Sequence, residues 1–155
     1  MKVQRRVTPF LGFNTQAAEA AEFYVSIIPD SRIVKTVKNP ASGATMLVEF
    51  ELSGLPMIAL NMGQECKMTY AFSLSVACET QAEIDRVWGL LADGGQEVQC
   101  GWVTDRFGLS WQVVPSQISD WMSSPDPARS GRVFNELMQM IKLDIAKLQA
   151  AYEGK

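Results

Sequence analysis

Apolar and polar positions alternate along the chain in stretches that predict strands and helices in a regular order. Residues 7–13 are rich in β-branched and aromatic side chains, which favours a strand. Residues 15–28 place apolar side chains at three- and four-residue spacing, which is typical of an amphipathic helix. Turn-forming residues then separate three further β-prone stretches, at 31–38, 45–52 and 56–62. The first part of the chain is therefore expected to fold as βαβββ.

The second half repeats this order. Residues 72–78 alternate between apolar and small polar side chains, which predicts a strand with one buried face. A helix is expected directly after this strand, because Thr80 and Glu83 have the spacing of a capping box. Strands then resume, and the clearest of them are expected over 97–104 and 108–114. The second half is therefore expected to be another βαβββ unit.

Two short sequence echoes support an internal duplication. Thr15-Gln16-Ala17 recurs as Thr80-Gln81-Ala82 at the start of each helix, and Gly54-Leu55 recurs as Gly108-Leu109 at the start of each last strand. Both echoes occupy equivalent points of the two halves, as expected when a supersecondary unit is repeated. We therefore expect two copies of one module.

The residues after the second module change to a helical pattern. The apolar side chains at helical spacing are Val133, Leu137, Met138 and Ile141. This tail is expected to pack on the sheet or on a partner subunit. The expected organisation is one domain, residues 1–155, with a first module (7–63), a second module (70–115) and a C-terminal helical extension (116–155).

Composition narrows the classes of function. The chain has 155 residues and a net charge of −3, with no basic stripe that would suit nucleic acid. No apolar run is long enough to cross a membrane and no signal peptide is recognisable, so a cytoplasmic location is expected. Cys66, Cys78 and Cys100 lack the spacing of a metal site or a disulfide framework, and we expect each to be a buried small side chain. The chain has no histidine, which excludes imidazole as a catalyst or a metal ligand.

Five short strings carry a family resemblance. They are Thr8-Pro9-Phe10-Leu11, Ala20-Ala21-Glu22-Phe23-Tyr24, Pro29-Asp30-Ser31-Arg32-Ile33, Cys100-Gly101-Trp102 and Asp105-Arg106-Phe107-Gly108-Leu109-Ser110-Trp111-Gln112-Val113-Val114-Pro115. With the duplicated module, they resemble the vicinal-oxygen-chelate superfamily and its PhnB-like branch, also labelled 3-demethylubiquinone-9 3-methyltransferase-like. The resemblance implies the glyoxalase/bleomycin-resistance fold: an α+β class with two βαβββ modules, each forming a cupped mixed sheet, plus C-terminal helices. It also implies paired chains, so a homodimer is expected.

The resemblance further indicates where metal-using members hold their ligands, which are usually histidine and glutamate. Strand register places these positions near Arg6 or Thr8, near Met57 or Ile58, at about Ala71 and at Gln112. A lone amide oxygen beside methyl, thioether or hydroxyl groups lacks the charge and ligand number that a divalent transition metal requires. We expect no metal and no other cofactor. A Rossmann-type methyl-donor site is not expected either, because no strand leads into a glycine-rich turn and helix.

The cup of each module is the expected binding site. The candidate ligand-binding residues lie on strands whose inner face should line a cup, and they are Thr8, Asn61, Ser73, Ser75, Trp102 and Gln112. Trp111 is expected to pack on the outer face beneath a helix, because neighbours in a strand face opposite sides. Asp105 and Arg106 are expected to form an exposed turn pair. Glu49 and Glu51 are expected to face solvent.

Two functions of different classes remain open at this stage. The first is a metal-independent protein that binds a small aromatic or amphipathic molecule in a groove. The second is an enzyme, either PhnB-like or a metal-free lyase or isomerase, for which Asp105, Glu65 or Cys66 would have to act in the cavity. The first is favoured because no pair of residues demands catalysis. The identity of the ligand stays open.

Overall fold

The computed structural model describes residues 7–155, and the chain divides into two compact units with the boundary between Lys67 and Met68. Arg6, one of the expected ligand positions, lies outside the described residues. No helix in the described part of the chain is long and apolar enough to cross a membrane. The elements follow the order expected from the hydrophobic pattern.

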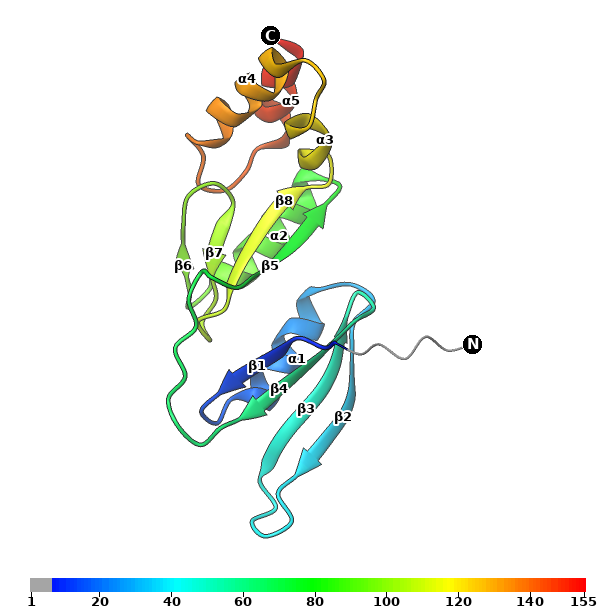
Figure 1. Cartoon of the computed structure of the whole chain (residues 1–155), viewed down its shortest axis with the longest axis vertical. Coiled ribbons are helices and arrows are strands. Elements are labelled where there is room, and N and C mark those ends of the chain that lie inside the picture. Colours follow the sequence, from blue (N-terminus) through cyan, green and yellow to red (C-terminus); the bar gives the residue numbers. More distant parts are fainter. Residues whose placement is uncertain (1–6) are drawn as a thin grey trace, which may run out of the picture. The chain divides into compact units, whose positions relative to one another are not determined.

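The first unit is built on one sheet. Its elements are β1 (Phe10–Phe13), α1 (Ala17–Ile27), β2 (Arg32–Lys38), β3 (Thr45–Leu52) and β4 (Leu55–Asn61). The strand order is β1-β4-β3-β2, in which β1 runs parallel to β4 and the other pairs are antiparallel (Figure 1). α1 packs on one face of this sheet, and Tyr24, Phe50 and Met57 are fully buried in the resulting core.

The start of α1 depends on a side chain from β4. The N-cap residue Gln16 makes no side-chain cap, and the Asn61 Oδ1 instead accepts a hydrogen bond from the Ala17 amide at 2.8 Å. The Asn61 Nδ2 donates to the Thr45 carbonyl at 3.0 Å. Asn61 therefore satisfies an amide that a helix start leaves without an intrahelical partner, and it joins the helix to two strands.

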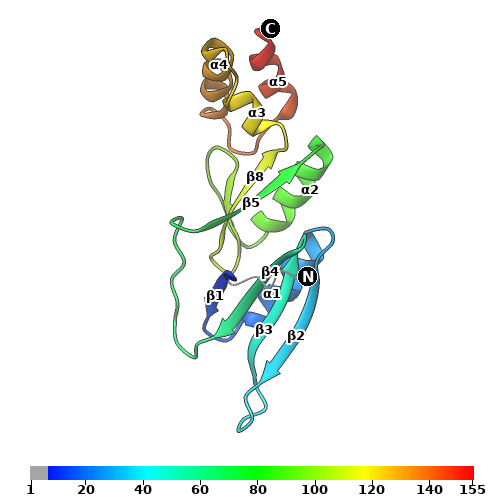
Figure 2. The same ribbon diagram turned by 45° about the vertical axis from the view of Figure 1, so that its right-hand side comes forward.

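The second unit repeats this arrangement. Its module contains β5 (Ser73–Cys78), α2 (Gln81–Ala92), β6 (Gln96–Glu97), β7 (Trp102–Thr104) and β8 (Ser110–Pro115), with the strand order β5-β8-β7-β6. α2 lies along one face of this sheet (Figure 2). The Thr80 hydroxyl accepts from the Glu83 amide at 3.2 Å, and the predicted capping box is confirmed. The α+β class with two mixed sheets is also confirmed.

The prediction of one continuous strand over 97–104 is wrong. Cys100 and Gly101 have φ angles of 62° and 81°, and they turn the chain between β6 and β7. Left-handed residues interrupt the extended backbone that a strand requires. The residues on both sides of this turn favour strands, so the sequence pattern did not indicate the break.

The C-terminal extension forms a small core of its own. Its helices are α3 (Ile118–Met122), α4 (Pro127–Leu137) and α5 (Ile145–Glu153). Five buried side chains make up this core, and they are Trp121, Val133, Met140, Leu143 and Leu148. Val114, near the end of β8, packs against them. The predicted apolar stripe is only partly correct, because α4 ends at Leu137 and leaves Met138 and Ile141 half exposed.

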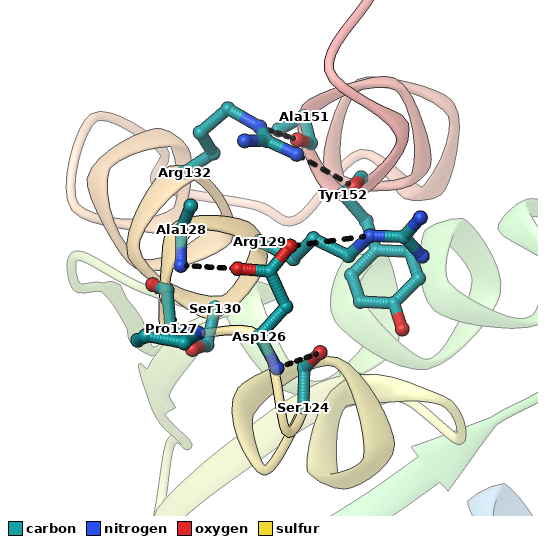
Figure 3. A network of polar contacts seen from close by, with 9 residues as sticks. All are labelled: Ser124, Asp126, Pro127, Ala128, Arg129, Ser130, Arg132, Ala151 and Tyr152. Atoms are coloured by element: carbon teal, nitrogen blue, oxygen red, sulfur yellow. Dashed lines mark hydrogen bonds and ion pairs between the residues drawn. The ribbon is translucent and has the colours of Figure 1, made fainter.

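Polar contacts also join α4 to α5 (Figure 3). Asp126 caps α4, since its Oδ1 accepts from the Ala128 amide at 3.0 Å. Arg132 donates to the carbonyls of Ala151 and Tyr152, at 2.8 and 3.1 Å, where the end of α5 leaves carbonyls without helical partners. The Arg129 guanidinium lies 5.0 Å from the centre of the Tyr152 ring. These charged contacts supplement the apolar packing between the two helices.

Candidate functional site

The two faces of the second sheet differ in character. Trp111 and Val113 of β8 are buried on the face that α2 covers, as expected for Trp111. Residues of the opposite parity point to the other face, which we call the cup face of the second sheet. Four of the predicted site residues share it, and they are Ser73, Ser75, Trp102 and Gln112.

Gln112 lies at the centre of this group. Its register partners are Ser75 on β5 and Trp102 on β7. Its Nε2 donates a hydrogen bond to the Ser73 Oγ at 3.0 Å. The structure therefore brings four predicted residues from three strands together on one face.

A hollow of about 410 Å³ opens beside this group. It is lined by Tyr70, Gln96, Val98, Gln99, Cys100, Trp102 and Thr104, and we call it the tryptophan pocket. Two aromatic rings, two amides, a hydroxyl and a thiol make up most of its wall, and no acidic or basic side chain is among its lining residues. Such a wall suits an aromatic or amphipathic molecule without a strong charge.

A smaller hollow of about 210 Å³ shares part of this wall. Tyr70 and Thr104 line both hollows, and Ser110 adds a hydroxyl to the smaller one. Ser110 and Thr104 are register partners on β8 and β7. The cup face thus offers one aromatic region with hydroxyl groups next to it.

Asp105 has a structural position, so the prediction that it belongs to an exposed turn pair is wrong; Arg106 is exposed as expected. The Asp105 side chain is only 3% exposed. Its Oδ1 accepts from the amides of Phe107 and Leu109 at 2.8 and 3.1 Å, and its Oδ2 accepts from the Trp111 indole at 2.8 Å. The carboxylate therefore holds its own hairpin and the buried indole in place.

The two predicted site residues of the first unit lie apart from each other. Asn61 caps α1, on the face of the first sheet that the helix covers. Thr8 lines a separate cavity of about 460 Å³ within this unit. Glu49 and Glu51 line that cavity as well; as predicted they lie on the opposite face of the strand from the buried Val48 and Phe50, but they are only partly exposed. Arg32 pairs with Glu51 at 2.9 Å.

The expected metal positions do not supply a suitable ligand set. Met57 is buried in the first core, Ile58 lines the cavity of the first unit, and Ala71 is exposed. Gln112 is surrounded by hydroxyl groups and an indole. Within residues 7–155, no three His, Cys, Asp or Glu side chains gather closely enough to hold an ion. The donors around Gln112 are neutral and fit a divalent transition metal poorly.

The prediction that all three cysteines are buried holds only for Cys78. Burial and, to a lesser extent, the nearby Glu83 carboxylate raise the pKa of the Cys78 thiol to about 11, although the Arg86 charge opposes them. Cys66 and Cys100 are half-buried. Cys100 belongs to the wall of the tryptophan pocket.

Several pocket residues escaped prediction from the sequence. Thr104 lies two positions after Trp102 on the same strand, so alternation alone could have placed it on the cup face. Tyr70, Gln99 and Cys100 lie in loops, where no periodicity indicates direction. Their place in the wall follows from the turn between β6 and β7 and from the segment that leads into β5.

Comparisons with known proteins agree with the geometry. Residues 5–114 match the family model described as 3-demethylubiquinone-9 3-methyltransferase. The PhnB protein from Bacillus cereus is 30% identical, with a TM-score of 0.65, and the match covers 71% of this chain and 99% of that one. None of the curated proteins matches the chain.

Two more distant structures share the fold. Protein PA1353 from Pseudomonas aeruginosa is 20% identical with a TM-score of 0.58, and the match covers 72% of this chain and 98% of that one. The fosfomycin resistance protein FosX from Listeria monocytogenes is 10% identical with a TM-score of 0.58, and the match covers 79% and 99%. At these identities the likeness concerns architecture and not activity.

Proposed function

Since the chain belongs to the 3-demethylubiquinone-9 3-methyltransferase family of the vicinal-oxygen-chelate superfamily, we propose that it binds a small, uncharged aromatic or amphipathic molecule in the tryptophan pocket, without a metal ion. The observation that carries this proposal is the wall of the pocket. Trp102 and Tyr70 supply aromatic surface, and the other lining groups are uncharged. Planar apolar ligands gain most from such surface, while hydroxyl and amide groups fix their orientation.

Methyl transfer, which the family description names, is not part of this proposal. A Rossmann-type site holds its cofactor at a glycine-rich turn between a strand and a helix. In this chain β1 leads to α1 through Asn14-Thr15-Gln16, and β5 leads to α2 through Glu79-Thr80. Neither connection contains a glycine, so the backbone of a phosphate-binding or cofactor-binding turn is not built there.

A metal-free lyase or isomerase is the alternative function, and the candidate acids support it less well. The Asp105 carboxylate already accepts three hydrogen bonds within its hairpin. Glu65 and Cys66 are not among the residues that line the tryptophan pocket. A general acid or base needs hydrogen-bond reach to its substrate, and none of these three groups belongs to the wall of this pocket.

The binding proposal predicts that Trp102→Ala weakens the affinity for 1-naphthol, an uncharged amphipathic probe, about tenfold, because the variant removes a large apolar contact. Isothermal titration calorimetry of the full chain measures the dissociation constant. Leu90→Ala is the control, since Leu90 is an exposed apolar residue on α2 outside the pocket wall. Equal affinity of Trp102→Ala and the parent protein would place the probe elsewhere and contradict the proposal.

Two additional measurements separate the alternatives. Prior dialysis against a chelator should leave the naphthol affinity unchanged if binding needs no metal. Mass spectrometry of the recovered probe should show it unaltered after long incubation, whereas an enzyme acting on it would convert it. Thermal stabilisation that grows with probe concentration provides independent evidence of binding to the folded state.

The expected homodimer and the cytoplasmic location remain predictions. Half-exposed apolar side chains on the extension, Phe134, Met138 and Ile141, provide surface that a second copy could cover. Light scattering at micromolar concentration should therefore give twice the 17.1 kDa mass of the chain. A single species of 17.1 kDa would reject the dimer.

A further inference from the structure

The wall of the tryptophan pocket is held by a segment of the C-terminal extension. The Cys100 amide donates to the Met140 carbonyl at 2.8 Å, and the next amide, Gly101, donates to the Ile141 carbonyl at 2.8 Å. Two successive amides therefore bind two successive carbonyls. We call residues 140–145 the strap and residues 98–101 the wall loop.

Close packing accompanies these bonds. A Cβ atom at Gly101 would lie 2.9 Å from the Leu143 Cγ and 3.0 Å from the Val113 carbonyl oxygen. Leu143 is fully buried in the core of the extension. The strap can therefore approach the wall loop this closely only because residue 101 is a glycine.

The other side of the strap is bound to α2. The Gln81 Nε2 donates to the Leu143 carbonyl at 3.0 Å, and the Gln81 Oε1 accepts from the Ile145 amide at 2.9 Å. Lys142 forms an ion pair with Asp85 at 2.6 Å, one turn further along α2. The hydrogen bond from Lys142, and then that from Gln81, lower the pKa of the Asp85 carboxyl below its usual value. Gln81 thus fixes the strap through its backbone, and the strap fixes the wall loop.

This arrangement joins residues outside the part of the chain that matches the family to residues inside it. The family model ends at residue 114, and 71% of this chain accounts for 99% of the Bacillus cereus chain. The strap belongs to the additional residues, whereas the wall loop belongs to the matched module. In this chain, residues added to the family's module therefore support part of its pocket.

We propose that Gln81 is a positioning residue, which acts through the strap to hold the wall loop and so sets the affinity of the tryptophan pocket for its ligand. Only the effect on ligand affinity rests on the proposed binding function; the effect of Gln81 on the wall loop does not. Without the strap, the amides of Cys100 and Gly101 lose their partners, and two residues of left-handed backbone lose two of the hydrogen bonds that hold them. The wall loop then opens more often, and a ligand must order it again on binding.

The first test follows the loop itself, through the reaction of Cys100 with 5,5′-dithiobis(2-nitrobenzoate). In a Cys66→Ser background Cys100 is the reporting thiol, because Cys78 is buried and its pKa is raised to about 11. Gln81→Leu removes both hydrogen bonds to the strap and should raise the labelling rate about fivefold or more. Gln149→Leu is the control, since Gln149 bonds Glu153 on α5, away from the strap, and should leave the rate unchanged.

Gln81→Glu provides a second variant. Its carboxylate can still accept from the Ile145 amide, but it cannot donate to the Leu143 carbonyl or to Asp85, so its labelling rate should also exceed that of the parent. Circular dichroism shows whether each variant is folded. If Gln81→Leu fails to fold, Gln81→Glu decides the question by the same rate. Labelling at the parent rate in a folded variant would overturn the inference.

The second test measures the dissociation constant of 1-naphthol for the same proteins. Gln81→Leu should weaken binding about threefold to tenfold, in step with faster labelling of Cys100. Faster labelling with unchanged affinity would overturn the link between strap and pocket. If the parent protein does not bind the probe, the proposed function fails by itself, and the labelling rates still decide whether the strap positions the loop.

Discussion

Replacing Asp105 with alanine is expected to lower the free energy of unfolding by about 3 kcal/mol, because it leaves buried donors without their acceptor. The amides of Phe107 and Leu109 and the Trp111 indole all donate to this carboxylate. Urea unfolding followed by circular dichroism measures the loss. Asp126→Ala is the control: that carboxylate is exposed and caps α4 through the Ala128 amide, so its loss should cost only about 1 kcal/mol.

A double-mutant cycle isolates the bond between Asp105 and the indole. In the parent protein, Asp105→Asn can keep its oxygen on the two hairpin amides, but its NH₂ group then opposes the Trp111 N–H. In a Trp111→Phe background this opposition disappears. Asp105→Asn should therefore cost about 1 kcal/mol less there than in the parent protein. Equal costs in the two backgrounds would show that the carboxylate does not act through the indole.

The order of elements and half of the site could be predicted because they depend on local patterns. Alternation along a strand placed Ser73 and Ser75 on one face, and the same rule set Gln112 opposite to Trp111. The capping box at Thr80 involves neighbours three residues apart and was equally readable. Such patterns depend only on residues a few positions apart, so they can be recognised in the sequence without knowledge of the tertiary structure.

These failures depend on tertiary contacts that the local pattern does not show. Asn61 is a polar residue of a type that often binds ligands, but here its side chain accepts a hydrogen bond from the Ala17 amide, 44 positions earlier. Asp105 lies in a sequence typical of an exposed turn, but its carboxylate bonds the Trp111 indole, whose direction is set by the sheet. The break at Cys100 is stabilised by carbonyls of Met140 and Ile141, about 40 residues later. Local propensities do not report such tertiary contacts, so the sequence alone could not indicate them.

Because the extension packs closely on the wall loop, Gly101→Ala is also expected to lower the free energy of unfolding strongly. An alanine there must adopt a φ near the observed 81°, which is unfavourable for a residue with a Cβ. The new Cβ would also press on the buried Leu143 side chain and on the Val113 carbonyl. The two costs together should lower the free energy of unfolding by about 3 kcal/mol. Urea unfolding measures this loss directly.

Gly131→Ala is the matched control for this substitution, and it should act in the opposite direction. Gly131 lies inside α4, and none of the described atoms beyond its own helix lies within 4 Å of a Cβ placed there. Alanine is the better helix former, so this variant should gain up to about 1 kcal/mol. Left-handed backbone and close packing at residue 101 are then the cause of the contrast. If Gly101→Ala proved as stable as the parent, the close approach of strap and wall loop would be refuted.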